Sequence, residues 1–267
     1  MQLDLDDRIA LVTGASKGIG LAITQTLLEE GARVVAVSRT RSPEIDGLAG
    51  ELVHVTADLM DPDRPAEVVA RAVGEFGGLD ILVNNAGGPP PDTKLPRFGF
   101  LELDDTDWRE MFEFNLFSAV RACRAAIPAM IERGAGAIVN VSSGHGRQPS
   151  AINVDYGAAK AAMINLTKAL SEEFAPQGVR VNGVCPGPVR TPWWTDEGGA
   201  ADILAAATGS DRESVMTTVA PEMMQLATGR LADPKEIAFA VAFLASPRSA
   251  STTGAEFVVD SGMLKTS

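Results

Sequence analysis

The chain has 267 residues, of which 45% are hydrophobic and 22% charged, the balance of an ordinary globular protein with a sizeable core. Acids outnumber bases 35 to 23, and the net charge of −12 makes nucleic acid and anionic membrane surfaces poor partners. No export signal or apolar run of the ~18–20 residues that span a bilayer is seen, and two cysteines with two separated histidines offer no disulfide framework or metal site, so we expect a cytoplasmic protein without a metal.

The first third of the chain alternates strands with helices. Residues 8–14, RIALVTG, form a β-branched apolar run that ends in glycine, which predicts a buried strand. Residues 18–31 have helical spacing and stop at Gly31, a residue suited to a left-handed helix cap. The alternation continues with strands over 33–38, 51–57 and 80–85 and with a helix over 65–77.

The second half of the chain repeats this alternation. A long helix is predicted over 107–133, broken near Asn115. Strands follow over 136–143, 179–187 and 255–262, with helices over 155–175 and 234–246. Apolar strands that alternate with amphipathic helices indicate a parallel sheet covered on both faces. Right-handed crossovers make this a doubly wound α/β Rossmann fold of about seven strands, with a ligand crevice at the carboxyl ends of the strands.

Two segments depart from the alternation. The Pro-rich stretch at about 88–106 and the longer stretch at about 191–230 look like excursions from the fold. No linker, repeat or low-complexity segment divides the chain. We therefore expect a single catalytic domain over residues 1–267.

The loop after the first strand reads TGASKGIG over residues 13–20. Its glycines permit a tight turn and a close backbone approach, so a diphosphate can meet the free N–H groups at the start of the following helix. The spacing G-x-x-x-G-x-G differs from the general dinucleotide fingerprint G-x-G-x-x-G. By itself the loop also fits a purely structural turn between a strand and a helix.

Motifs spread along the chain resemble those of the short-chain dehydrogenase/reductase family. In chain order they are TGASKGIG at 13–20, Asp58 after the third strand, NNAG at 84–87, Asn115, Ser143, Tyr156 with Lys160, and PGPVRT at 186–191. The resemblance runs from about residue 5 to residue 262 and is to the 3-oxoacyl-ACP reductase-like and carbonyl reductase members. Ser261 and Pro188 depart from the family pattern, and both lie outside the catalytic set.

The pair Tyr156 and Lys160 carries the expected acid–base chemistry. Tyr156 is the only tyrosine of the chain, and residues i and i+4 share one face of a helix, so the phenol and the ammonium can address one site. A nearby cation favours the phenolate and lowers its pKa from about 10 toward neutral pH. Carbonyl reduction needs such a proton donor, because hydride arriving at carbon leaves negative charge on oxygen. The alternative is a buried phenol beside a solvated lysine.

Ser143 and Asn115 complete the predicted catalytic set. Ser143 ends a strand at the ligand edge of the sheet, where its hydroxyl is expected to bind the substrate oxygen. The family's spacing to the tyrosine selects it over the adjacent Ser142. Asn115 is a polar residue in an otherwise apolar helix. By resemblance it supports a water that links Lys160 to solvent as a proton relay, whereas a role in bending the helix alone is the alternative.

The resemblance also implies the residues that contact the dinucleotide. They are Gly14, Ser16, Lys17, Gly18, Ile19 and Gly20 in the glycine loop, Asp58 and Leu59 at the adenine, Asn85, Ala86 and Gly87 at the adenosine, and Pro186, Gly187, Val189 and Thr191 at the nicotinamide and diphosphate. Tyr156 and Lys160 contact the cofactor as well, Lys160 through the ribose hydroxyls. For Asp58 an ordinary turn before a helix is a serious alternative.

The end of the second strand predicts which nicotinamide is used. An acid at this place binds the 2′-hydroxyl of NAD, whereas an arginine accommodates the 2′-phosphate of NADP. Here the strand ends in Ser38 and Arg39, and Lys17 adds a second cation from the glycine loop. A planar guanidinium and a point charge are both suited to a phosphate. We expect NADP(H) in preference to NAD(H), against the alternative of a surface arginine with no role.

The expected activity is reduction of a ketone to a secondary alcohol with NADPH, or the reverse oxidation. Within the same family, an NAD-dependent alcohol dehydrogenase is the alternative, and an epimerase or dehydratase is disfavoured because those branches usually run longer. A non-catalytic regulator that senses dinucleotides would need the glycine loop but not the Tyr–Lys pair.

The sequence does not identify the substrate. By resemblance, residues 191–230 form a mobile substrate lid, and the Pro-rich stretch with Phe98 and Phe100 borders the same cleft. Large apolar residues of the lid either line a pocket or pack the lid onto the body; they are Trp193, Trp194, Met216, Met223 and Met224. The family pairs the helices at 107–133 and 155–175 across subunits, and their apolar excess leads us to expect a homotetramer.

Overall fold

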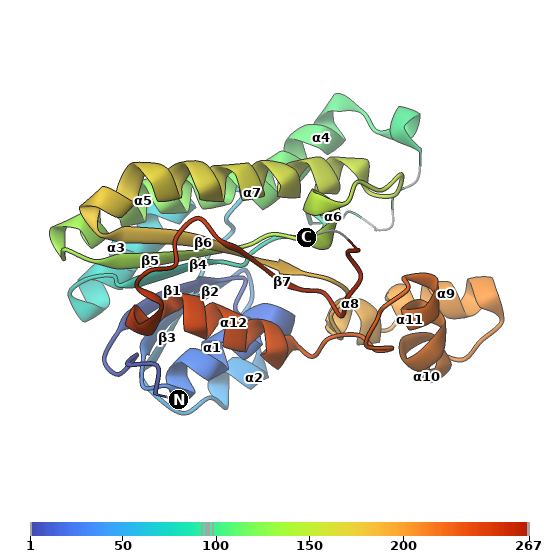
Figure 1. Ribbon diagram of the computed structural model, residues 1–267, viewed down its shortest axis with the longest axis horizontal. Helices are drawn as coiled ribbons and strands as arrows, with labels where there is room; N and C mark the ends of the chain where they lie inside the picture. The colour runs from blue at the N-terminus through green and yellow to red at the C-terminus, as the bar shows by residue number, and fades with distance from the viewer. Residues whose placement is uncertain (1, 92, 94–96, 98, 266–267) are drawn as a thin grey trace.

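The computed structural model describes residues 2–91, 93, 97 and 99–265, and in this part of the chain seven strands form one parallel sheet (Figure 1). The strands are β1 (Ile9–Thr13), β2 (Arg33–Ser38), β3 (Leu52–Thr56), β4 (Ile81–Asn84), β5 (Gly136–Val141), β6 (Val179–Pro186) and β7 (Glu256–Val259). Their order across the sheet is β3-β2-β1-β4-β5-β6-β7. The predicted doubly wound α/β fold is confirmed.

The sheet is apolar along its centre because both of its faces are covered. All five residues of β1 and all four of β4 are buried. Strand β1 pairs with β2 on one side and with β4 on the other, so the winding direction reverses between them. In such sheets the ligand crevice lies outside the carboxyl ends of the strands at this reversal.

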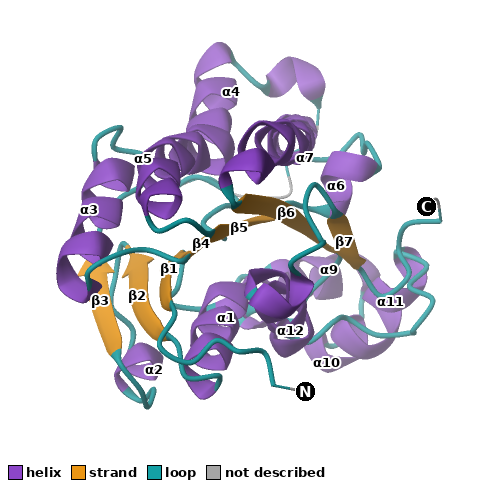
Figure 2. Ribbon diagram, turned by 60° about the vertical axis from the view of Figure 1, so that its left-hand side comes forward, coloured by secondary structure: helices purple, strands orange, loops and turns teal. Residues whose placement is uncertain are grey.

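Helices cover the two faces, as Figure 2 shows. One face carries α1 (Gly18–Glu29) and α12 (Pro234–Ala245), which pack on each other. The opposite face carries α3 (Arg64–Phe76), α5 (Ser118–Glu132) and α7 (Val154–Phe174). Each face has its own apolar core, which contains Ile23, Leu27 and Val241 on the first face and Val68, Ala126 and Ile138 on the second.

The break that the sequence predicts near Asn115 is a π-helical turn. Helix α4 (Asp105–Phe112) starts at a capping box made by Asp104 and Asp107, and α5 continues beyond the π turn η2 (Glu113–Phe117). Asn115 lies inside this turn and is fully buried. π turns of this kind inside α-helices often mark functional positions.

The stretch after β6 folds as a separate layer of short helices at one end of the molecule (Figure 1). It comprises α8 (Pro192–Thr195), α9 (Ala200–Thr208), α10 (Arg212–Ser214), the π turn η4 (Val215–Val219) and α11 (Ala220–Met223). A small apolar core of its own joins Trp194, Met216 and Leu231. Trp194 and Met216 therefore hold this segment together, whereas Trp193 and Met223 are exposed.

Outside residues 191–230, five short elements of the described chain were not expected from the sequence. They are α2 (Pro43–Asp46), η1 (Phe100–Glu102), α6 (Gly144–Arg147), η3 (Ala175–Gln177) and η5 (Pro247–Ser249). Each is three or four residues long, too short to show a helical period in the sequence. Phe98, which we expected to border the cleft, lies outside the described residues, and Phe100 is exposed in η1.

Candidate active site

The predicted catalytic residues meet at the carboxyl edge of the sheet. Ser143 follows β5, Tyr156 and Lys160 lie in the first two turns of α7, and Asn115 comes from the π turn. The Lys160 Nζ is 5.7 Å from the centre of the Tyr156 ring. A Cβ at Gly87, after β4, would lie 2.8 Å from both the Asn115 Oδ1 and the Lys160 Nζ. Four separate elements thus bring these groups to one place.

Burial shapes the charge of the Lys160 ammonium. Its side chain is 3% exposed, and Nζ donates to the carbonyl of Val141 over 3.0 Å. Desolvation lowers the pKa of Lys160 to about 8, and the Glu256 carboxyl opposes that shift. The cationic form is therefore retained only below about pH 8.

The pKa of Tyr156 departs from our expectation of a lowered value. Burial raises the pKa of the phenol, and a hydrogen bond with the Ser143 side chain opposes this shift. The largest cause is burial, which outweighs the lowering that we expected from the nearby cation. In the protein without cofactor the phenol is protonated at neutral pH, as a proton donor must be.

The two adjacent serines have different surroundings. The Ser142 hydroxyl lies within hydrogen-bond distance of both the Val184 carbonyl, at 3.1 Å, and the Glu256 carboxyl, so both of its partners are inside the protein. Ser143 is half-buried at the start of α6, where its oxygen accepts from the His145 N–H over 3.3 Å. The structure therefore leaves Ser143, the serine chosen by family spacing, as the one facing the site's tyrosine.

Asn115 binds backbone with its whole amide group. Its Oδ1 accepts from the Gly88 N–H over 2.8 Å, and its Nδ2 donates to the Gly88 carbonyl over 2.8 Å and the Met111 carbonyl over 3.1 Å. The side chain thus joins the helix to the loop after β4. These contacts give Asn115 a structural role, and its part in a proton relay stays a prediction.

The glycine loop provides a cradle for a diphosphate. The N-cap residue of α1, Lys17, makes no side-chain cap, so the first N–H groups of this helix remain available to an anion. Gly18 has a φ of 56°, and a Cβ there would lie 3.3 Å from the Thr191 side chain. The loops after β1 and β6 therefore face each other closely, as binding of one ligand between them requires.

The remaining predicted cofactor residues line the same edge. Thr13 Oγ1 accepts from the N–H groups of Asn85 and Ala86, each over 3.0 Å, which fixes the loop after β4. Asp58 is exposed, and its Oδ1 accepts from the Met60 N–H over 3.0 Å within an ordinary turn, while Leu59 is buried. Without a ligand, Asp58 therefore makes the contacts of an ordinary turn before a helix, which is the alternative to a role in binding adenine.

The loop after β6 is held by the chain that follows the lid. The Pro188 carbonyl accepts from the Ala232 N–H, and the Arg190 N–H donates to the Ala232 carbonyl, both over 2.9 Å. The Gly187 N–H donates to the Val259 carbonyl over 3.1 Å. The Val189 side chain is buried in this loop, and its predicted contact with a nicotinamide stays a prediction.

The end of β2 presents one free guanidinium. The buried Ser38 hydroxyl donates to the Thr40 carbonyl over 2.8 Å, and Arg41 pairs with Asp46 at 2.5 Å. Arg39 is exposed, its guanidinium carbon lies 5.9 Å from the Phe114 ring centre, and no carboxylate of the described residues forms an ion pair with it. Residues of this kind fit a 2′-phosphate, and an NAD-selecting acid is missing from this strand end.

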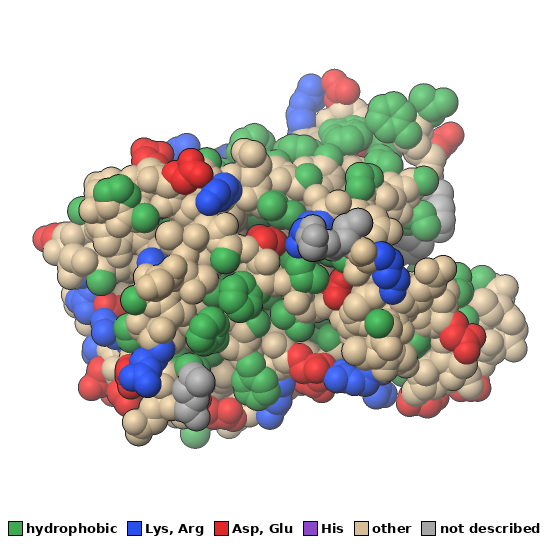
Figure 3. Space-filling model, in the orientation of Figure 1, with side chains coloured by type: hydrophobic (Ala, Val, Ile, Leu, Met, Phe, Trp, Pro, Cys, Tyr) green, Lys and Arg blue, Asp and Glu red, His purple; other side chains and the backbone are tan. Residues whose placement is uncertain are grey.

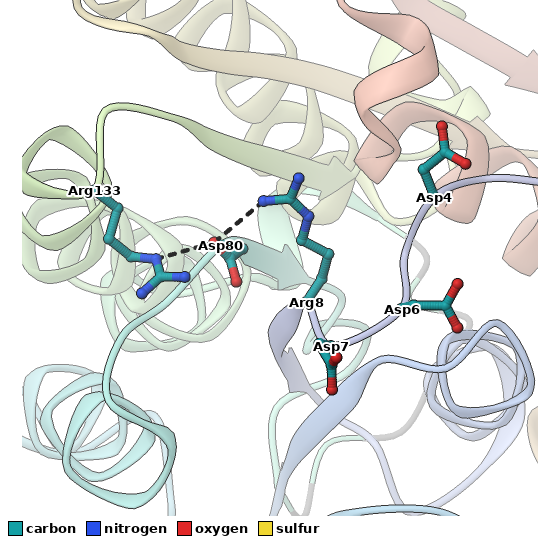
Figure 4. A pocket seen from close by; sticks show the side chains of 6 residues that line it. All are labelled: Asp4, Asp6, Asp7, Arg8, Asp80 and Arg133. Atoms are coloured by element: carbon teal, nitrogen blue, oxygen red, sulfur yellow. Dashed lines mark hydrogen bonds and ion pairs between the residues drawn. The ribbon is translucent and has the colours of Figure 1, made fainter.

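A hollow of about 330 Å³ on the molecule is unrelated to this site (Figure 4). It lies where β1 and β4 begin, at the edge opposite the catalytic groups. Its polar groups stabilise the fold, because Asp80 accepts from the Ile9 N–H over 2.8 Å and pairs with Arg133 at 3.0 Å. Arg8 adds a longer ion pair at 3.7 Å.

One polar residue beside the site escaped the sequence analysis. Glu256 stands in the otherwise apolar strand β7, and its carboxyl binds the Ser142 hydroxyl. Burial raises the pKa of this carboxyl, and Lys160 is among the cations that oppose the shift. An acid within an apolar strand was the available signal, but only the sheet order brings β7 next to β6.

Within residues 2–91, 93, 97 and 99–265, no helix is long and apolar enough to cross a membrane. The same described residues contain no group of three His, Cys, Asp or Glu side chains placed to hold a metal ion.

Comparisons with known proteins agree with one another. The family model for short chain dehydrogenases matches residues 8–200. The 3-oxoacyl-(acyl-carrier-protein) reductase FabG of Vibrio cholerae is 37% identical over 264 residues, covering 98% of this chain and 99% of that protein. Oxidoreductase UcpA of Escherichia coli is 38% identical over 267 residues, covering 97% and 95%.

Solved structures give the same result. L-sorbose reductase from Gluconobacter frateurii, complexed with NADPH and L-sorbose, superposes with a TM-score of 0.90 at 33% identity and full coverage of both chains. A single-residue variant of actinorhodin polyketide ketoreductase with NADPH has a TM-score of 0.84 at 32% identity, covering 98% of this chain and 99% of that one.

Proposed function

Because the chain belongs to the short-chain dehydrogenase family, we propose that it reduces a ketone to a secondary alcohol with NADPH, or catalyses the reverse oxidation. The observation that carries this proposal is the meeting of Ser143, Tyr156 and Lys160 beside the loop at Gly87. Reductases among the relatives, two of them in complex with NADPH, support it further.

The proposed mechanism assigns one task to each side chain. The loops after β1, β4 and β6 would hold a reduced nicotinamide, which would supply the hydride for the carbonyl carbon. The Ser143 hydroxyl binds the carbonyl oxygen, and the Tyr156 phenol, protonated at neutral pH, gives that oxygen its proton. Lys160 keeps a positive charge 5.7 Å from the phenol ring and has two further hydrogens for ribose hydroxyls. That charge stabilises the phenolate left after proton transfer.

Arg39 is the proposed reason for a preference for NADPH. Arg39 is exposed and directly follows the second strand, and it forms no ion pair with a carboxylate of the described residues. Charge-assisted hydrogen bonds contribute about 1.5–3 kcal/mol, so one arginine accounts for about 10- to 100-fold preference. Lys17, also exposed, adds less because its flexible stem loses more freedom for each bond formed.

The test is a screen of ketones with NADPH and NADH, and of alcohols with the oxidised cofactors, followed at the nicotinamide absorbance. We expect wild-type kcat/KM to favour NADPH and Arg39→Asp to reverse the preference. Arg41→Asp is the matched control for Arg39→Asp, because Arg41 is already paired with Asp46. A wild-type preference for NADH would instead support the NAD-dependent alcohol dehydrogenase, and binding without turnover would support the dinucleotide sensor.

A further inference from the structure

Arg97, in the Pro-rich stretch before α4, makes an unusual set of contacts. Its Nη1 lies 2.9 Å from the Asp155 Oδ2 and 3.2 Å from the Asp107 Oδ1, and its Nη2 donates to the Thr93 hydroxyl over 3.1 Å. The Arg97 side chain is 12% exposed and that of Asp155 is fully buried. Buried ion pairs with this many partners differ from surface pairs, which contribute little.

The backbone of Arg97 is attached at the same place. Its N–H donates to the Asn153 Oδ1 over 2.7 Å, and its carbonyl accepts from the Asn153 N–H over 3.0 Å. Asn153 is the residue before α7 and has a φ of 57°, in the left-handed region that asparagine adopts more readily than most other non-glycine residues. Its two contacts with the Arg97 backbone attach that residue directly before the helix.

These contacts connect the first turns of two helices of the site. Asp107 lies in the first turn of α4, and Asp155 lies in the first turn of α7, directly before Tyr156. The two helices pack on each other (Figure 1). Because Arg97 pairs with a carboxylate on each, its positive charge offsets the repulsion between two like charges across the junction.

Gly88, which precedes Arg97 in the chain, is also attached to the site. Gly88 is bound from both sides by the Asn115 amide, at 2.8 Å in each case. Gly88 is therefore attached to the π turn, and Arg97 to the start of the helix that carries Tyr156.

We propose that Arg97 is a positioning residue, which holds the first turn of α7 and thereby sets the place of the Tyr156 phenol relative to Ser143. The inference rests on the proposed carbonyl reduction, in which Tyr156 donates the proton. It assigns the Pro-rich stretch a part in turnover that is separate from contact with the substrate. Displacement of a reacting group by ~1 Å costs about 100-fold in rate, so loss of Arg97 should lower kcat by about 10- to 100-fold.

The test compares Arg97→Met, Arg97→Lys and Asp155→Asn with wild type. We expect kcat to fall most in Arg97→Met, which leaves two unpaired carboxylates, and less in the other two, which keep part of the contacts. The Kd for NADPH, measured by cofactor fluorescence, should stay within about twofold of wild type, because the glycine loop and Arg39 are untouched. Arg109→Met is the matched control, since Arg109 is in α4 but exposed and pairs only with Asp105 among the described residues.

If Arg97 only stabilised the fold, its replacement would lower the stability of the protein, but it would not lower kcat while leaving NADPH binding unchanged. In Arg97→Ala, millimolar guanidinium, well below denaturing levels, should restore kcat in a saturable manner by filling the vacated place. Wild-type kcat in folded Arg97→Met, or an equal loss of kcat and NADPH binding in Arg97→Lys and Asp155→Asn, would overturn the inference. Absence of turnover in wild type would refute the proposed function instead, so the two failures are distinguishable.

Discussion

A single methyl group at Gly87 should disable the site. The glycine lies where the loop after β4 passes Asn115 and Lys160, and a Cβ there would be 2.8 Å from the Asn115 Oδ1 and 2.8 Å from the Lys160 Nζ. An ordinary van der Waals contact begins at 3.4 Å, so each polar atom has to retreat by about 0.6 Å in Gly87→Ala.

Displacement of either polar atom strains a hydrogen bond that holds the site together. The Asn115 Oδ1 accepts from the Gly88 N–H over 2.8 Å, and the Lys160 Nζ donates to the Val141 carbonyl over 3.0 Å. A hydrogen bond to a charged group contributes about 1.5–3 kcal/mol, which corresponds to about 10- to 100-fold in rate if the loss is felt in the transition state. We therefore expect kcat to fall by that factor, with a higher KM for NADPH.

The assay is steady-state reduction of the best ketone from the screen, with thermal melting measured on the same samples. The control is Gly74→Ala in α3, where a Cβ meets nothing within 4 Å. This second variant should keep wild-type kcat and gain about 0.5–1 kcal/mol of stability, because alanine is the better helix former. Wild-type kcat and KM in Gly87→Ala would falsify the tight convergence of Asn115 and Lys160 described here.

Four further predictions concern the proton, the charge, the lid and the assembly. Tyr156→Phe should bind NADPH normally and lose about 10²–10⁴-fold in turnover; near-normal turnover would remove the phenol from the mechanism. The pKa of Lys160, lowered to about 8, means that the cation is lost as pH rises through that value, so kcat should fall above about pH 8. Glu256→Gln should move this limb to lower pH, because Glu256 raises the pKa of Lys160, and an unmoved limb would contradict the assignment. Limited proteolysis should cut within residues 191–230 in the free protein and spare them with NADPH and substrate bound; equal rates in both states would show that they do not respond to ligand. Light scattering should find a tetramer, since an apolar groove lies along the second half of α5 beside the last residue of α7, Phe174, and exposed apolar side chains gather over η1 and α4 (Figure 3). A monomer at micromolar concentration would refute this.

The local pattern of residues was sufficient to predict the fold and to identify the family. Strand and helix periods, glycine positions and the spacing of Tyr156 to Lys160 involve neighbours within one or two turns, so they can be read along the chain. A break in the long helix near Asn115 was also predicted from the sequence, but only the structure shows that the break is a π turn. The family comparisons confirm the resemblance that these motifs indicate.

Electrostatics and long-range pairing were decided only by the tertiary structure. The pKa of Tyr156 is raised where the Tyr–Lys spacing alone led us to expect a lowered value, because burial penalises the charged form and depends on every element packed around the phenol. Glu256 reaches Ser142 across 114 positions, and Arg97 reaches Asp155 across 58. No helical or strand period relates residues so far apart; the sheet order and the packing of α4 on α7 bring them together, and the charge state of the site follows from those contacts.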